Sequence, residues 1–370
     1  EPEGAPPHYI VRVMRQGDIP RDQKWINLIF RPEDVLEELE QKTIKMGELF
    51  EPSRGNTVWS IWALSHGKRP DLGANNFFYL RPSEVDYWNI KDYVYPALKT
   101  SRYAKFFTFT KEDWEQLQEK DRKCYVFMAH KPFEELSEGA KAYIKWGETE
   151  CTTGIRRTRG GGKRCSEALA CQERAKPANR RWFYGWYDLG GVVPVSIFMP
   201  YYAQYKHRFE LALMNVMLDA DFIAFIPKID RSFTQNQLKA LCAYLNSTFV
   251  QLYIETKGRM TGGGAIALEA SQAQGIPVID PRALDEEVLR ELAALFDKLE
   301  RRARELGGAD RRENIMELWD TVIAEVDYKV AEILGLPEAL ADMARQLAKT
   351  MMERRLARAE EARPGALRGT

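Results

Sequence analysis

Several sequence patterns that identify enzymes are absent from this chain. It contains no G-x-x-x-x-G-K-[ST] phosphate-binding loop, no G-x-G-x-x-G between a strand and a helix, no H-E-x-x-H and no G-x-S-x-G. It has only four histidines, which occur in unrelated contexts, and we interpret each as structural. No run of about 18 apolar residues occurs, so we expect no transmembrane helix and no membrane partner.

Cysteine is also scarce. The five cysteines are Cys124, Cys151, Cys165, Cys171 and Cys242. An odd number in a chain of this length does not suggest a disulfide framework, so we predict a cytoplasmic protein. Cys151, Cys165 and Cys171 lack the paired C-x₂₋₄-C spacing of structural zinc sites. We therefore expect no metal; zinc at these three residues is kept as an alternative to free or buried thiols.

Net charge is zero, so bulk basicity does not indicate a nucleic-acid partner. Residues 151–182, however, hold nine Lys or Arg and two acidic residues. The candidate DNA-binding residues there are Arg156, Arg157, Arg159, Lys163, Arg164, Arg180 and Arg181. Arginine on a glycine-rich loop suits phosphate clamping and bidentate contacts with guanine in a major groove. The alternative is a solvated, mobile loop whose charge serves solubility.

A second basic, glycine-rich stretch runs from Lys257-Gly258-Arg259 to Gly262-Gly263-Gly264. Three adjacent glycines weaken a helix or strand. We interpret them as a place where the backbone, at Gly263, approaches a phosphate strand while Lys257 and Arg259 neutralise its charge. The alternative is a helix C-terminus with Gly258 at C′. Glu255-Thr256-Lys257 also has the E-x-K shape of a nuclease half-site, but no convincing acidic partner precedes it nearby.

The hydrophobic periodicity predicts an α+β fold with a helical C-terminal part. Strand-like runs include 124–128, 182–184 and 222–226. Thr234 and Gln237 form a capping-box pattern that begins a helix over 235–255. Apolar spacings of four and three predict a helical hairpin, 288–306 and 315–333, and a third helix from about 338 to 361.

The order of these landmarks resembles the C-terminal target-recognition region of adenine-N6 DNA methyltransferases of the Taq-type and Eco57I-type restriction–modification families. The resemblance spans roughly residues 25–340. The matching pieces are Leu49-Phe50 with Arg54-Gly55, the segment 73–80, Arg181-Trp182-Phe183-Tyr184, the segment 243–248, Gly262-Gly263-Gly264, Ile276-Pro277-Val278, Glu325-Val326-Asp327 and the segment 333–336.

This resemblance implies a module for sequence-specific recognition of double-stranded DNA, with Arg54, Asn56 and Asn75 as further DNA-binding candidates. It implies three segments: an entry segment 1–50, a target-recognition domain 51–282 and a helical domain 283–370. The family's cofactor-binding glycine motif is absent, as is the Asn/Asp-Pro-Pro-Tyr/Phe tetrapeptide that holds a flipped adenine.

We therefore predict the non-catalytic part of a site-specific adenine methyltransferase, either a fragment or a separate specificity subunit. Its expected partners are double-stranded DNA and a methyltransferase catalytic domain or subunit. S-adenosylmethionine is expected only in that missing part, and no cofactor in this chain. A metal-dependent nuclease or another DNA-processing enzyme is the alternative.

Overall fold

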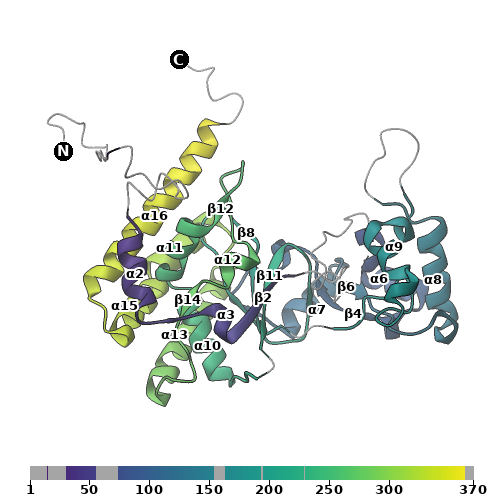
Figure 1. Ribbon diagram of the computed structural model, residues 1–370, viewed down its shortest axis with the longest axis horizontal. Helices are drawn as coiled ribbons and strands as arrows, with labels where there is room; N and C mark the ends of the chain where they lie inside the picture. The colour runs from purple at the N-terminus through teal and green to yellow at the C-terminus, as the bar shows by residue number, and fades with distance from the viewer. Residues whose placement is uncertain are drawn as a thin grey trace. The chain divides into compact units, whose positions relative to one another are not determined.

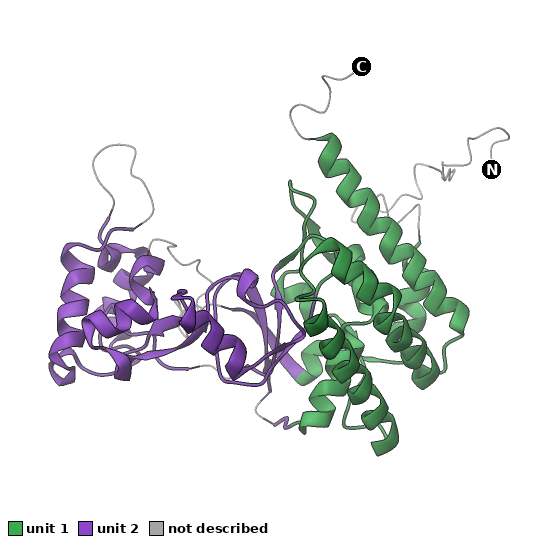
Figure 2. Ribbon diagram, turned by 180° about the vertical axis from the view of Figure 1, so that it is seen from behind, with its two compact units in different colours: residues 1–49, 202–207, 233–370 green, residues 50–201, 208–232 purple. Residues whose placement is uncertain are grey.

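The computed structural model describes residues 15, 31–55, 74–153, 163–192, 195–228 and 230–362. The chain divides into two compact units (Figure 2). Unit 1 comprises residues 1–49, 202–207 and 233–370, and unit 2 comprises residues 50–201 and 208–232. This division cuts the chain at different places from the three segments expected from the sequence, because residues 233–282 share a unit with the terminal helices. The predicted α+β fold with a helical C-terminal part is confirmed.

Unit 2 contains a five-stranded sheet. Its strand order is β2 (Phe50–Arg54), β11 (Phe222–Pro227), β7 (Ile197–Pro200), β9 (Glu210–Ala212) and β5 (Thr108–Phe109). Only the β5–β9 pair is parallel. Phe198 and Phe222 meet edge to face at 5.5 Å in the core of this sheet. Trp114 and Leu117 of α7 (Lys111–Glu119) pack against the same core, so this helix covers the sheet.

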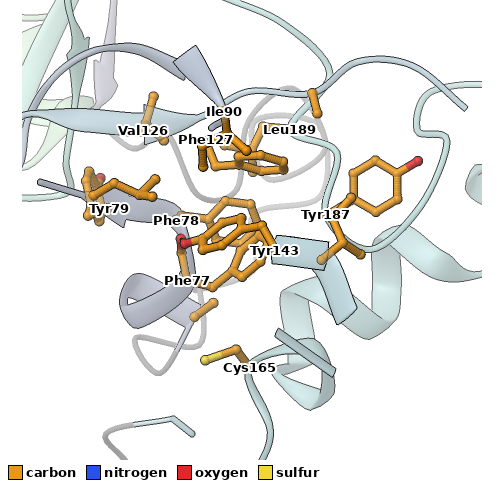
Figure 3. Close-up of a cluster of buried hydrophobic side chains, with 14 of the residues drawn as sticks. Phe77, Phe78, Tyr79, Ile90, Val126, Phe127, Tyr143, Cys165, Tyr187 and Leu189 are labelled. Atoms are coloured by element: carbon orange, nitrogen blue, oxygen red, sulfur yellow. The ribbon is translucent and has the colours of Figure 1, made fainter. Parts of the chain in front are cut away.

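A second sheet of unit 2 has the order β10 (Met217–Leu218), β4 (Val94–Leu98), β6 (Tyr125–Phe127) and β3 (Tyr79–Leu80). Its helices are α5 (Asn75–Phe78), α6 (Pro82–Trp88), α8 (Glu138–Thr149) and α9 (Leu169–Ala175) (Figure 1). Aromatic rings fill the core between them (Figure 3): Phe77 stacks on Tyr143 at 4.6 Å and meets Phe127 at 5.3 Å. A Cβ at Gly147 would lie 2.5 Å from Trp186, so glycine allows α8 to approach these rings.

Unit 1 begins with α2 (Glu33–Glu40), β1 (Ile44–Lys45) and α3 (Met46–Leu49), and β1 pairs with β14 (Pro277–Val278). The capping box predicted at Thr234 and Gln237 is confirmed. The single helix predicted over 235–255 is wrong: α10 (Gln235–Leu245) and α11 (Thr248–Lys257) are separate helices. The helical conformation is interrupted at Ser247, whose ψ of 163° is extended.

The C-terminal helices of unit 1 are α13 (Glu286–Glu305), α14 (Arg312–Asp320), α15 (Val322–Leu334) and α16 (Glu338–Glu361). The third helix lies where the sequence predicts it, but the second is broken at Thr321. The buried side of α13 is also rotated from its predicted position. Leu289, Leu292, Phe296, Leu299 and Ala303 are buried, whereas Val288 and Leu295 are only partly covered. None of the described helices is long and apolar enough to cross a bilayer.

A buried polar network explains the break before α11. The carboxylate of Asp327, fully buried on α15, accepts hydrogen bonds from Thr248 N at 2.6 Å, Thr248 Oγ1 at 2.5 Å and Arg345 Nη1 at 2.7 Å. Trp319 Nε1 donates to Thr248 Oγ1 at 2.8 Å. Helix N-termini carry amide groups without intrahelical partners, and here an acid from another helix satisfies one. The network joins two segments on which the family resemblance rests, 243–248 and Glu325-Val326-Asp327, and it gives both a structural role.

Candidate nucleic-acid interface

Residues 180–190 of unit 2 form an irregular loop, so the strand predicted over 182–184 is wrong. Side chains of this loop divide sharply between core and solvent. Phe183, Trp186, Tyr187 and Leu189 are at most 8% exposed and belong to the interior. Arg180 and Arg181 are exposed, as are Trp182 at 49% and Tyr184 at 53%. The loop therefore uses one set of aromatics as anchors and holds another set, with two cations, on the surface.

The anchors fix the loop to the aromatic core of unit 2. Trp186 lies 4.6 Å from the Phe77 ring, and its Nε1 donates to Glu148 Oε1 at 2.9 Å. Tyr187 donates its hydroxyl proton to the Lys131 carbonyl at 2.8 Å; Figure 3 shows its side chain within the cluster. Arg174, buried on α9, donates from Nε to the Trp186 carbonyl at 3.0 Å, and its burial lowers the pKa of its guanidinium.

Asp188 organises the loop from within. Its fully buried carboxylate accepts from Tyr184 N at 2.8 Å and from Gly190 N at 2.7 Å. It also lies 2.8 Å from His130 Nδ1. Gly190 has a φ of 77°, a left-handed conformation that favours glycine and lets its amide turn back to the carboxylate. The buried carboxylate of Asp188 therefore contacts the backbone amides and the imidazole of His130, and it is not exposed at the surface.

A pocket of about 330 Å³ opens over this loop. It is lined by His130, Arg180, Arg181, Trp182, Phe183, Tyr184 and Gly190. The His130 ring lies 5.0 Å from that of Tyr184, and the Arg181 guanidinium lies 5.2 Å from the centre of the Trp182 ring. Within the described residues, no ion pair joins either arginine to a carboxylate. The structure thus brings Arg180 and Arg181 together in one pocket and adds His130, which our reading of the sequence did not select.

Among the basic residues of 151–182, Lys163 and Arg164 are described by the structure. Arg156, Arg157 and Arg159 lie outside the described residues, as does Asn56. Thr153 N donates to the Lys163 carbonyl at 2.8 Å. Arg164 is exposed; its backbone N donates to Glu167 Oε2 at 2.8 Å and its Nη1 to the Glu150 carbonyl at 3.2 Å. These contacts hold residues 151–153 and 163–167 side by side.

A disulfide between Cys151 and Cys165 reinforces this pairing and corrects the zinc alternative. Two of the three proposed ligands are bonded to each other, and Cys171 is buried with its Sγ 3.3 Å from Arg174 Nη2. Across the described residues, no group of three or more His, Cys, Asp or Glu side chains is placed to hold a metal. The expectation of free or buried thiols for these three residues holds for Cys171 but is wrong for the bonded pair.

Arg54 and Asn75 are less exposed to solvent than Arg180 and Arg181 of the loop. Arg54, at the end of β2, donates from Nε to the Ala220 carbonyl at 2.9 Å. Its guanidinium lies 3.8 Å over the Tyr201 ring, a cation–π contact that fixes the side chain. Asn75 is partly buried in the first turn of α5. Arg54 therefore has a structural role within unit 2 that the sequence did not reveal.

The second basic stretch forms a hairpin in unit 1, with β12 (Arg259–Met260) paired to β13 (Ile266–Ala267) and β13 to β8 (Tyr202–Ala203). Gly264 has a φ of 79°, and a Cβ there would lie 2.8 Å from Ala359 of α16. A Cβ at Gly262 or Gly263 would meet nothing within 4 Å. Of the three adjacent glycines, Gly264 alone is thus required by the fold, and Gly263 is exposed.

Gly258 follows α11, as the alternative interpretation expects, but its φ of −63° and ψ of 160° are extended. Glycine is needed there because a Cβ would lie 2.6 Å from the Ile254 carbonyl oxygen. The side chains on either side differ in their contacts. Lys257 is exposed, whereas Arg259 Nη2 lies 3.3 Å from Glu269 Oε1.

Glu255 is not available as a nuclease ligand in this arrangement. Its buried carboxylate accepts from Arg355 Nη2 at 2.8 Å and Nε at 3.1 Å, and from Gln251 Nε2 at 3.1 Å. Arg355, on α16, also donates to the Gly264 carbonyl. The E-x-K pattern therefore belongs to a buried ion pair that joins α11, α16 and the hairpin.

Comparison with known proteins shows likenesses of sequence and of fold. Residues 72–156 match the family described as Type II methyltransferase M.Eco57I, C-terminal domain. Type II methyltransferase M.AccI of Acinetobacter calcoaceticus is 22% identical over 225 residues, which are 60% of this chain and 37% of that protein. The crystal structure of the type IIG restriction endonuclease BpuSI matches with a TM-score of 0.51 at 13% identity, over 90% of this chain and 34% of that chain, a likeness of fold. The chain spans about a third of the length of these two proteins.

Proposed function

We propose that this chain, whose residues 72–156 match the C-terminal domain of Type II methyltransferase M.Eco57I, recognises a specific sequence in double-stranded DNA. It would do so as the non-catalytic part of an adenine-N6 methyltransferase or restriction–modification enzyme. A methyltransferase catalytic segment, which would bind S-adenosylmethionine, is its proposed partner. We also propose a cytoplasmic location; the disulfide between Cys151 and Cys165 removes the cysteine count as its support, and the proposed DNA partner supports it instead.

The observation that carries this proposal is the division of side chains in the loop 180–190. Arg180 and Arg181 are exposed on a loop that Phe183, Trp186 and Tyr187 anchor in the core. Cations contribute the electrostatic part of DNA binding, and a rigid support gives them a fixed register on the duplex. A loop kept only for solubility would not need its position fixed by Asp188 and by the buried Trp186 and Tyr187.

The other candidate residues extend the proposal to further surfaces. In unit 2 we assign phosphate or base contacts to Lys163 and Arg164, together with Arg156, Arg157 and Arg159 of the intervening segment. Asn56 and Asn75 are proposed contacts of the same unit, and Arg54 would act beside them while stacked on Tyr201. In unit 1 the proposed contacts are Lys257, Arg259 and the backbone of Gly263.

Selection of binding sites from random DNA duplexes tests this function. The chain is expected to enrich one short sequence that contains an adenine, and a catalytic partner should sharpen that enrichment. No enrichment in either condition would contradict the proposal. Calorimetry with S-adenosylmethionine is a second test: the isolated chain should show no binding, whereas micromolar binding would mean that a methyltransferase site lies within it.

A further inference from the structure

We propose that the pocket over the loop 180–190 binds one unpaired nucleotide of a DNA strand. The base would stack against Trp182 and Tyr184, and the phosphate would lie at Arg180 and Arg181. This inference rests on the proposed DNA-binding function and adds to it a site for a base that has left the duplex stack. Nothing in the pattern of basic residues alone distinguishes such a site from a surface for the intact backbone.

Two exposed aromatic rings of the loop, Trp182 and Tyr184, are suited to stack on a base. Trp182 and Tyr184 leave about half of their surface in water, although the same loop buries Phe183 between them and Trp186 just beyond. In paired DNA the faces of the bases are covered by their neighbours, and a protein reaches only base edges, sugars and phosphates. Exposed aromatic rings are therefore matched to a base that is unstacked, as in single-strand binding sites.

The charges of the pocket carry the second step. Arg180 and Arg181 line it, and guanidinium groups bind phosphate oxygens in a bidentate manner. The acidic group just behind the pocket, Asp188, has a fully buried carboxylate that contacts two backbone amides and His130. That carboxylate therefore opposes an anion in the pocket less than an exposed one would, and the lining itself is cationic and aromatic.

The rigidity of the pocket carries the third step. His130 Nδ1 faces Asp188, so Nε2 on the other edge of the half-exposed ring is the nitrogen left to meet a ligand. Tyr184 and Gly190 are held through their backbone amides to the same carboxylate. The walls are thus positioned before the ligand arrives, and such preorganisation reduces the ordering cost of binding. The volume, about 330 Å³, is within the range of small-ligand sites.

The test compares DNAs of one sequence: a fully paired duplex, the same duplex with one unpaired adenine, and the single strand. Binding of the full chain to each is measured by fluorescence anisotropy. The unpaired base should tighten binding by roughly 5- to 150-fold, the effect of stacking one base. The double variant Trp182→Ala/Tyr184→Ala should lose this preference and keep its affinity for the paired duplex. Tyr87→Ala is the matched control, because Tyr87 of α6 is 80% exposed and does not line the pocket.

The outcomes separate this inference from the proposed function. Equal affinity for paired and bulged duplexes, or a preference that survives in the double variant, overturns the pocket while leaving duplex recognition intact. Failure to bind any of the DNAs overturns both. Competition by dAMP or by inorganic phosphate distinguishes the source of the ligand: if either displaces bulged DNA at a concentration similar to that of the DNA itself, the site serves a free nucleotide or phosphate, and the inference is wrong. Unchanged melting temperature in all variants shows that they fold.

Discussion

The hairpin of unit 1, which begins at Lys257, and the loop 180–190 of unit 2 both combine basic residues with glycines, but they are built differently. In the hairpin of unit 1, Gly264 is required by its conformation and by α16, while Arg259 pairs with Glu269. In the loop of unit 2, the carboxylate of Asp188 is directed to the backbone, and Arg180 and Arg181 stay at the surface. The hairpin is thus largely explained by the fold, whereas the loop has exposed groups that packing does not explain.

This difference shows what a charge count omits. A cation that is paired with a carboxylate of its own chain contributes less to the binding of an external anion than an unpaired cation does. A glycine required by packing needs no ligand to account for it. Composition treats both segments as equal candidates, but contacts within each unit rank the loop above the hairpin as a DNA-binding surface.

The largest effect is expected for Arg355→Ala. The buried guanidinium joins Glu255 to the Gly264 carbonyl, and removing one partner of a buried ion pair costs about 3–5 kcal/mol. Urea unfolding measures this loss. Arg358→Ala on the exposed side of the same helix is the control and should change stability by less than about 0.5 kcal/mol. Similar unfolding curves for the two variants would remove the structural explanation of the hairpin.

Asp188→Ala should have the next largest effect. It leaves Tyr184 N and Gly190 N without their buried acceptor, and because both hydrogen bonds are only part-buried we expect a total loss of about 1–3 kcal/mol. Asp188→Asn keeps the volume and one acceptor oxygen, so it should lose less. Unfolding midpoints and DNA affinity should fall together in the alanine variant. An alanine variant that is less stable but binds DNA normally would show that loop rigidity is unnecessary for binding.

Glycine substitutions in the hairpin should show a smaller, position-specific effect. Gly264→Ala places a side chain at a φ of 79° and against Ala359, so a loss of about 1–2 kcal/mol is expected. Gly262→Ala and Gly263→Ala meet open space and should change stability by less than about 0.5 kcal/mol. Thermal melting distinguishes the three variants. If Gly263→Ala weakens DNA binding without changing stability, the backbone approach proposed for Gly263 gains support.

Local signals predicted local structure well. The capping pattern at Thr234 and Gln237 and the long helix 338–361 depend on neighbours in the sequence, and both are confirmed. The break before Thr248 depends on Asp327, 79 residues away, and no local pattern indicates it. The strand predicted over 182–184 failed because aromatic residues favour any half-buried surface, including a loop anchored in a core.

The candidate site also depends on contacts between residues that are distant in the sequence, which local patterns do not indicate. Arg180 and Arg181 stand out by charge, but His130 and Asp188 are 58 residues apart and become informative only when the fold joins them. The pairing of Cys151 with Cys165 is likewise a matter of spatial proximity. An odd cysteine count could not indicate it, because three other cysteines remain free and buried.

The smallest effect concerns the salt dependence of duplex binding and tests the ranking of the two segments directly. Each phosphate contact removed should reduce the slope of log K against log salt by about 0.9. Arg180→Ala and Arg181→Ala should each approach this value without loss of stability, because both side chains are exposed. Arg259→Ala should change the slope less than Lys257→Ala, since Glu269 already offsets the charge of Arg259. Equal slopes for all four variants would mean that the internal ion pair is exchanged for phosphate at little cost, and that the hairpin and the loop contact DNA alike.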